Sequence, residues 1–131
     1  MFNHIMVGSN DIERSARFYT AVLGVLGAGE PMRSLAPSGH VRLFYRHDGN
    51  TFGVCEPING EPATSANGAT IGFKCASPEQ LQQFHDTAVA AGGTSIEEPP
   101  GLRTGDLGQL YLAYVRDPDG NQRGALHRPP R

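Results

Sequence analysis

The sequence predicts an α+β protein made of two tandem βαβββ modules, which together form a half-barrel mixed sheet with a concave pocket. Its 17 glycines and 10 prolines in 131 residues supply more turns than a helical bundle uses. Two amphipathic helical segments each follow an alternating strand, and a shared Asp-Gly-Asn-x-x-Gly sequence opens the last strand of each half. We expect one domain over 1–131, with module 1 at 1–56, a linker at 57–68 and module 2 at 69–127.

Module 1 begins with an alternating strand at 2–8, followed by Ser9-Asn10-Asp11, short polar residues that suit a helix N-cap. Apolar residues at three- and four-residue spacing then predict a helix that the glycines from Gly24 onward bring to an end. Three further strands are expected at 29–35, 40–46 and 51–56. Asp48-Gly49 predicts a hairpin turn between the last two of them.

Module 2 repeats this order after the turn-rich linker. A strand at 69–75 leads to Ser77-Pro78, where Ser77 can cap a helix, Pro78 suits its first position and Gln80 completes a capping box. Gly92-Gly93 end that helix, and strands are expected at 94–98, 110–116 and 122–127. The Pro/Gly-rich segment 97–108 is expected to be a long loop that acts as a lid, with glycine hinges.

Composition narrows the classes of partner. The net charge is −2 and the 11 Lys+Arg are scattered, so no nucleic-acid partner is expected. No apolar stretch approaches the roughly 18 residues typical of a membrane span, so no membrane partner is expected. Cys55 and Cys75 do not form a close pair, which favours free thiols and a cytoplasmic protein.

Two motifs in the expected order resemble the vicinal oxygen chelate superfamily, the group of glyoxalase I, bleomycin-resistance proteins and extradiol dioxygenases. The first motif follows the first strand and comprises Val7, Asp11, Ser15, Phe18-Tyr19 and Val22-Leu23-Gly24. The second, Asp117-Pro118-Asp119-Gly120-Asn121, precedes the last strand. The resemblance covers nearly the whole chain and implies the half-barrel fold. It also implies pairing of modules, across chains or within one chain, with the linker near the contact; because the half-barrel leaves sheet edges to cover, we expect a homodimer. Because this fold hosts several chemistries, the resemblance does not fix the function.

In metal-dependent relatives, as the resemblance implies, each module supplies one ligand from its first strand and one from its last. Those positions here are His4, Gly53, Thr70 and Gly124. A lone imidazole cannot supply the three or more donors that such a metal needs. We therefore expect no metal or other cofactor, and neither lactoylglutathione lyase nor extradiol dioxygenase activity.

Without metal ligands, other side chains must line the concave pocket, and the alternation of side chains along the strands predicts which ones face it. Glycines and a threonine at the lost ligand positions leave volume, and Arg42 suits recognition of an anionic group by paired hydrogen bonds. The candidate ligand-binding residues are His4, Arg42, Phe44, Gly53, Thr70, Gly72, Lys74, Tyr111, Tyr114 and Gly124. His4 is also the candidate catalytic residue, although the sequence does not show whether reaction follows binding.

Three functions remain open at this point. The first is binding of a small organic molecule, with an anionic group as one option, in a metal-free pocket. The second is a metal-dependent lyase, isomerase or dioxygenase with the irregular ligands His4, Glu56 and His127. The third is a non-catalytic interaction protein that retains only the fold.

Overall fold

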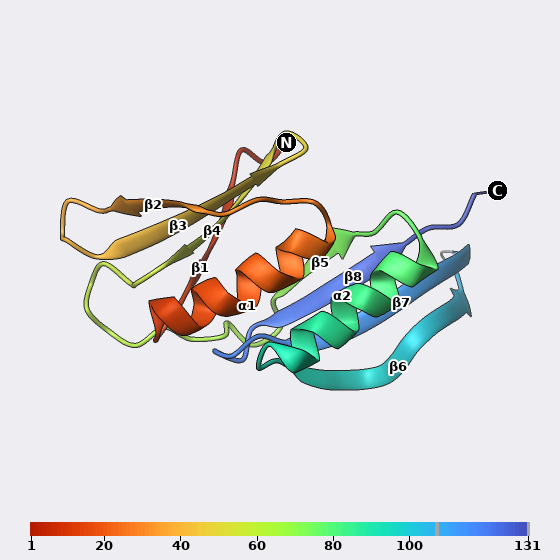
Figure 1. Ribbon diagram of the computed structural model, residues 1–131. Coiled ribbons are helices and arrows are strands. Elements are labelled where there is room, and N and C mark those ends of the chain that lie inside the picture. The colour runs from red at the N-terminus through yellow and green to blue at the C-terminus, as the bar shows by residue number, and fades with distance from the viewer. Residues whose placement is uncertain (107, 131) are drawn as a thin grey trace.

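The fold is described from a computed structural model, which covers residues 1–106 and 108–130 (Figure 1). The chain forms two successive βαβββ modules. The first contains β1 (Ile5–Gly8), α1 (Ile12–Val25), β2 (Met32–Leu35), β3 (Val41–His47) and β4 (Asn50–Cys55). The second contains β5 (Thr70–Lys74), α2 (Pro78–Ala90), β6 (Thr94–Gly105), β7 (Gly108–Arg116) and β8 (Gln122–His127).

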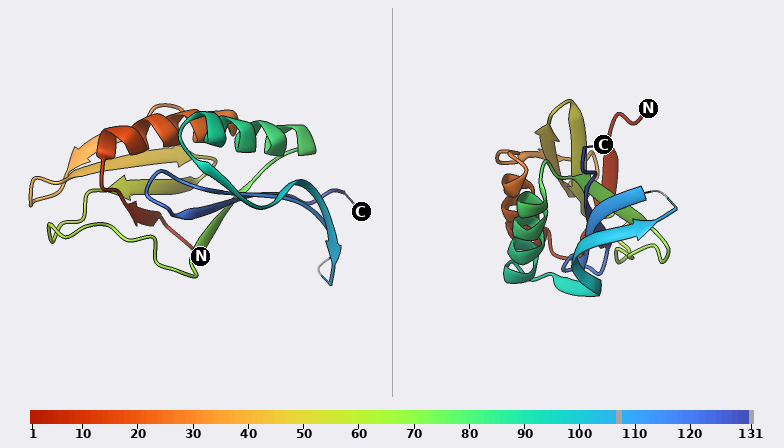
Figure 2. Two further views of the ribbon diagram at one scale, coloured as in Figure 1. Left: turned by 90° about the horizontal axis from the view of Figure 1, so that it is seen from below. Right: turned by 90° about the vertical axis from the view of Figure 1, so that its right-hand side faces the viewer.

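Each module folds into its own four-stranded mixed sheet, so the α+β architecture of repeated modules is confirmed. The strand orders are β1-β4-β3-β2 and β5-β8-β7-β6, and the first strand of each module runs parallel to the last. Within the described residues, no strand pairs across the two sheets, which therefore do not close into a barrel. Both helices lie on the same side of the sheets, next to each other (Figure 2).

The helix N-caps and the hairpin turn that the sequence predicts are present in the structure. The Asp11 carboxylate accepts from the Arg14 N–H at 3.1 Å, and the Ser77 hydroxyl accepts from the Gln80 N–H at 3.1 Å. These bonds satisfy amides that a helix leaves unpaired in its first turn. Asp48 and Gly49 have φ of 52° and 81° and form the two-residue turn of the β3–β4 hairpin, as expected.

The prediction that 97–108 forms a long loop and lid is wrong, because most of this segment is a β-strand. β6 continues to Gly105 and pairs with β7, with a register shift between Ile96 and Gly101. Pro99 and Pro100 lie in this irregular stretch of an edge strand, where the N–H groups that they lack need not complete a ladder. The prolines therefore interrupt the pairing without ending the strand. Residue 107, inside the expected loop, lies outside the described residues.

One hydrophobic core runs through both modules on the helix side of the sheets. Phe52 of module 1 and Phe73 of module 2 have ring centroids 5.4 Å apart, and Phe73 continues to Phe84 at 5.7 Å. Alternation places eight residues on the helix side of the sheets. Seven of them belong to this core, namely Val7, Val41, Leu43, Tyr45, Ile71, Phe73 and Cys75, whereas Ile5 is not part of it and lines the cleft described below.

Polar groups also join the modules. The Tyr19 hydroxyl of α1 donates to the buried Asp117 carboxylate and accepts from Arg123 Nε at 2.9 Å. Asp119 accepts from the Asn10 N–H at 2.9 Å and from the Ser15 hydroxyl at 3.1 Å. The Asp-Pro-Asp-Gly-Asn motif of module 2 therefore holds the start of the module 1 helix.

Candidate functional site

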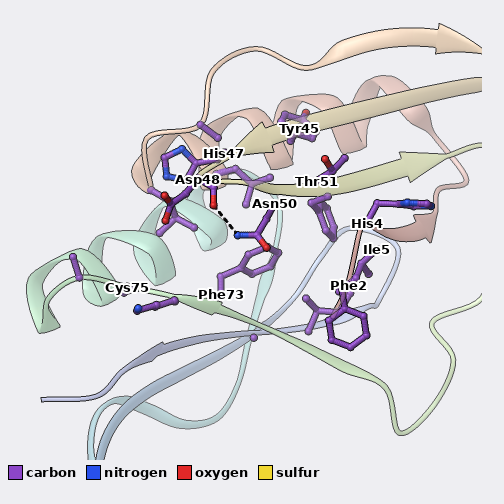
Figure 3. A pocket seen from close by; sticks show the side chains of 18 of the residues that line it. Phe2, His4, Ile5, Tyr45, His47, Asp48, Asn50, Thr51, Phe73 and Cys75 are labelled. Carbon is purple, nitrogen blue, oxygen red and sulfur yellow. Dashed lines mark hydrogen bonds between the residues drawn. The ribbon is translucent and has the colours of Figure 1, made fainter.

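A cleft of about 470 Å³ lies between the two modules, close to the open edges of β1 and β5 (Figure 3). Its apolar walls come from both modules, and the aromatic side chains among them are Phe2, Tyr45, Phe52 and Phe73. The C-terminal end of α1 adds Leu23 and Leu26. A cleft of this size with apolar walls has the dimensions of a small-molecule site.

Polar groups lie around this apolar volume. Asn50 Nδ2 donates to the Asp48 carbonyl at 3.2 Å, and the Phe73 ring projects toward Asn50 (Figure 3). Lys74 and Gln80 contribute from the module 2 side. Gln80 Nε2 also donates to the Val25 carbonyl at 3.1 Å, which ties the start of α2 to the end of α1. Apolar walls with a few polar side chains suit an organic ligand with an apolar body.

The Cys75 thiol lies in the same wall and is buried. Burial raises its pKa from 9.0 to about 11, although a hydrogen bond with the backbone of Leu126 acts in the opposite direction. The thiol is therefore protonated at neutral pH and is a poor nucleophile. Cys75 forms part of an apolar surface and does not supply a reactive group.

The glycines at the metal-ligand positions do not leave the open volume that the sequence predicts. A side chain added at Gly53 would meet Met6 Sδ at 2.3 Å, and one at Gly124 would meet the Tyr114 ring at 3.0 Å. Neighbouring side chains thus occupy the space in front of both glycines. Gly72 differs, because an added Cβ there meets nothing within 4 Å.

The other predicted site residues separate into two groups. His4, Gly72 and Lys74 line the cleft between the modules, and the His4 side chain points away from Phe73 and Asn50 (Figure 3). Thr70 is exposed at the start of β5 and is not among the lining residues.

Arg42 and Phe44 lie elsewhere, on β3 of module 1. Arg42 Nη2 donates to the Ser34 hydroxyl and to the Leu35 carbonyl, each at 3.0 Å, and its guanidinium lies 5.8 Å from the centre of the Phe44 ring. This places the guanidinium against β2. Neither residue lines the cleft.

The two tyrosines of β7, Tyr111 and Tyr114, lie on opposite faces of the sheet, because they are three positions apart along the strand, which is an odd spacing. Tyr111 packs against the shared core on the helix side. Tyr114 covers Gly124 on the other side. The structure thus does not bring the two hydroxyl groups to one ligand.

Residues 1–106 and 108–130 contain no group of three or more His, Cys, Asp or Glu side chains that could hold a metal. The irregular set of His4, Glu56 and His127 does not converge. Glu56 accepts from the Val41 N–H at 2.6 Å, and His127 Nδ1 donates to the Cys75 carbonyl at 3.0 Å. His4 bonds to its neighbour Asn3 at 2.8 Å. Within the described part of the chain these three side chains therefore do not form a metal site together.

Sequence reasoning missed several residues of the cleft, chiefly Asn50, Phe73 and Gln80. Alternation placed Phe2 on the concave face with His4, and Phe2 does line the cleft, whereas it assigned Phe73 to the core and so concealed that this ring also borders the cleft. The Asp-Gly-Asn turn was the one available signal, because it fixes Asn50 at the start of β4 next to the first strand.

The Glyoxalase/Bleomycin resistance protein/Dioxygenase superfamily model matches residues 1–122. The chain belongs to this superfamily. A glyoxalase/bleomycin resistance protein from Albidiferax ferrireducens is 55% identical in sequence, has a similar structure with a TM-score of 0.89, and is matched over 98% of this chain and 99% of that chain.

Two curated relatives are more distant. A virulence protein of Salmonella typhimurium is 29% identical over 91% of this chain and 78% of its own length. A probable lactoylglutathione lyase of Vibrio cholerae is 26% identical over 89% of this chain and 83% of its own length. In this superfamily member, His4 is the one side chain with a metal-binding group among the four family ligand positions, so these positions do not fit the family metal.

Proposed function

We propose that the protein binds a small organic molecule with an apolar body in the cleft between its modules. The cleft itself carries this proposal, since about 470 Å³ is bordered by aromatic side chains of both modules and by a small number of polar groups. The mutual packing of the modules around Phe52 and Phe73 supports a cleft that is formed before a ligand arrives.

Two side chains of the cleft that could react, Cys75 and His4, support binding more than catalysis. The Cys75 thiol is held in its neutral form, and the His4 imidazole bonds to the adjacent Asn3. We therefore propose sequestration or transport of the ligand as the function, with a purely structural interaction protein as the alternative that the experiment below excludes or supports.

The test uses N-phenylnaphthylamine, a neutral apolar fluorophore, as the probe. We expect saturable fluorescence enhancement in the wild type and a rise of about tenfold or more in Kd in Gly72→Leu, because the added side chain enters open space beside the cleft. Gly105→Leu is the matched control: within 1–106 and 108–130, this strand glycine also has nothing within 4 Å of an added Cβ, and it does not line the cleft. Equal Kd values in both variants, or no binding to the wild type, would contradict the proposal.

We further propose that the protein is a homodimer. Among the described strands, β1, β2, β5 and β6 each pair on one side only, and such edges readily pair with another chain. Met32 and Leu35 on β2 and Ile58 in the linker are exposed apolar side chains. Sedimentation equilibrium should give about twice the 14.0 kDa chain mass, and a concentration-independent monomer would contradict the dimer.

We also propose a cytoplasmic location. Both cysteines, Cys55 and Cys75, are free thiols, as is usual in a reducing compartment. Among the described residues, no helix is long and apolar enough to cross a membrane. Cell fractionation with antibody detection tests the location, and recovery in a periplasmic or extracellular fraction would contradict it.

A further inference from the structure

A second cleft, of about 580 Å³, adjoins the first along β5. The two clefts share five consecutive lining residues, from Gly72 to Ala76. The second cleft is completed by the end of β8 and the residue after it, namely Leu126, His127 and Arg128. β5 thus borders two neighbouring cavities with different surroundings.

The second cleft is basic. Lys74 and Arg128 carry positive charge, His127 adds an imidazole, and no acidic side chain is among the lining residues within 1–106 and 108–130. Lys74 is also the only lysine in the sequence. In contrast, the lining of the first cleft includes Asp48 and is mainly apolar. Ammonium and guanidinium groups beside a cavity favour a carboxylate, sulfonate or phosphate group.

The backbone of β5 adds hydrogen-bond donors. The Cys75 N–H donates to the Leu126 carbonyl at 2.8 Å and so points toward β8. Backbone groups alternate along a strand, and therefore the N–H groups of Gly72 and Lys74 point toward the open edge. Among the described residues, β5 has no strand on this side.

Gly72 lies where the two clefts adjoin. It lines both of them, and an added Cβ there meets none of the described atoms within 4 Å, so no side chain at this position separates them. The shared segment from Gly72 to Ala76 is roughly 13 Å long at about 3.3 Å per residue, so the two clefts adjoin over that length. One molecule can therefore occupy both clefts.

We infer that the ligand is an organic anion, whose apolar body lies in the first cleft and whose acidic group lies in the second cleft, beside Lys74 and Arg128. This inference rests on the proposed function and adds the charge of the ligand and the residues that recognise it. The side-chain charges of Lys74 and Arg128 recognise the acidic group, whereas the N–H groups at the open β5 edge point away from β8 and can donate to polar atoms of the ligand's body.

The experiment compares two probes with similar aromatic bodies, neutral N-phenylnaphthylamine and anionic anilinonaphthalene sulfonate. Arg128→Gln should raise the Kd of the anionic probe about 3- to 30-fold and change that of the neutral probe less than about twofold, because Arg128 lines the second cleft only. Lys74 lines both clefts, so Lys74→Gln should raise the Kd of the anionic probe by more than it raises that of the neutral probe. Arg17→Gln is the matched control, since Arg17 is an exposed arginine of α1 that lines neither cleft. It should change neither Kd.

A second readout uses the wild-type protein and so does not depend on the folding of a variant. Because Lys74 is the only lysine, acylation with acetic anhydride has two amine targets, Lys74 and the N-terminus. The anionic probe should slow acylation of Lys74, measured by peptide mass spectrometry with the N-terminus as internal reference. The neutral probe should protect Lys74 less.

The outcomes separate this inference from the proposed function. One set of results would contradict the anionic ligand but not the apolar cleft. In that case Gly72→Leu raises the Kd of the neutral probe, the charge variants leave the ratio of the two Kd values unchanged, and Lys74 is acylated equally with either probe. If Gly72→Leu has no effect on the neutral probe, the proposed function itself fails.

Discussion

Replacement of Asp119 by alanine tests whether the modules stabilise each other through the repeated Asp-Gly-Asn sequence. The Asp119 side chain is 3% exposed and accepts from three donors of module 1: the Asn10 N–H at 2.9 Å, Arg14 Nη2 at 3.0 Å and the Ser15 hydroxyl at 3.1 Å. Asp119→Ala removes all three bonds and leaves the start of α1 without this acceptor.

The magnitude follows from these contacts. Hydrogen bonds to a charged group contribute about 1.5 to 3 kcal/mol each, and breaking a buried ion pair costs about 3 to 5 kcal/mol. Two features reduce the loss: Arg14 is 40% exposed and can bind water, and the Ser15 hydroxyl keeps its bond to the Ser9 hydroxyl at 2.5 Å. We expect the free energy of unfolding to fall by about 3 kcal/mol, and Tm to fall by roughly 10 °C.

The assay is equilibrium unfolding in urea at neutral pH, followed by circular dichroism. Asp48→Asn is the control, because Asp48 is the equivalent residue of module 1, its carboxylate accepts no hydrogen bond from the described residues, and asparagine tolerates its φ of 52°. The control should change the free energy of unfolding by less than about 0.5 kcal/mol. A loss below about 1 kcal/mol in Asp119→Ala would refute the reasoning.

Three further predictions concern packing, pH and metal. Gly124→Phe should destabilise the protein by about 1 to 3 kcal/mol, because its side chain meets the Tyr114 ring at 3.0 Å, and an unchanged urea midpoint would contradict this. The folded-state pKa of Cys75 is raised from 9.0 to about 11, so the thiol contributes stability that is present below pH 9 and lost as the pH rises toward 11. In a series of unfolding curves at increasing pH, Cys75→Ala should therefore lose less stability over this range than the wild type. An equal loss in wild type and variant would rule this out. Zn²⁺ or Ni²⁺ should not raise Tm, whereas a native-state site at 100 times Kd would contribute about 2.7 kcal/mol; a saturable rise abolished by His4→Ala would show a metal site after all.

Much of the fold could be predicted because local chemistry and tertiary packing agree along most of the chain. Asp11 and Ser77 begin their helices as expected, and Asp48-Gly49 forms the expected turn. The predicted end of the strand at 94–98 was wrong, because Pro99-Pro100 normally end a strand. The sequence does not show that this strand lies at a sheet edge, where prolines are tolerated. Edge position depends on how the strands are ordered in space.

The candidate site was less predictable for a related reason. Alternation assigns each residue to a face of its own sheet, whereas the clefts lie along strand edges where residues of both faces become accessible. His4, Gly72 and Lys74 were identified, but the filling of the space at Gly53 by Met6 required knowledge of the side-chain packing. Arg42 was the predicted anion-binding residue, and its bonds to β2 place it away from both clefts.

The most direct test of the central claim is an amide-resolved NMR titration of the wild-type protein with N-phenylnaphthylamine. The cleft between the modules predicts the largest shift changes at Asn50, Thr51 and Phe73, with little change at β2. Largest changes at Arg42, Phe44 and Gly53 would instead place the ligand on the outer face of the module 1 sheet and contradict the account.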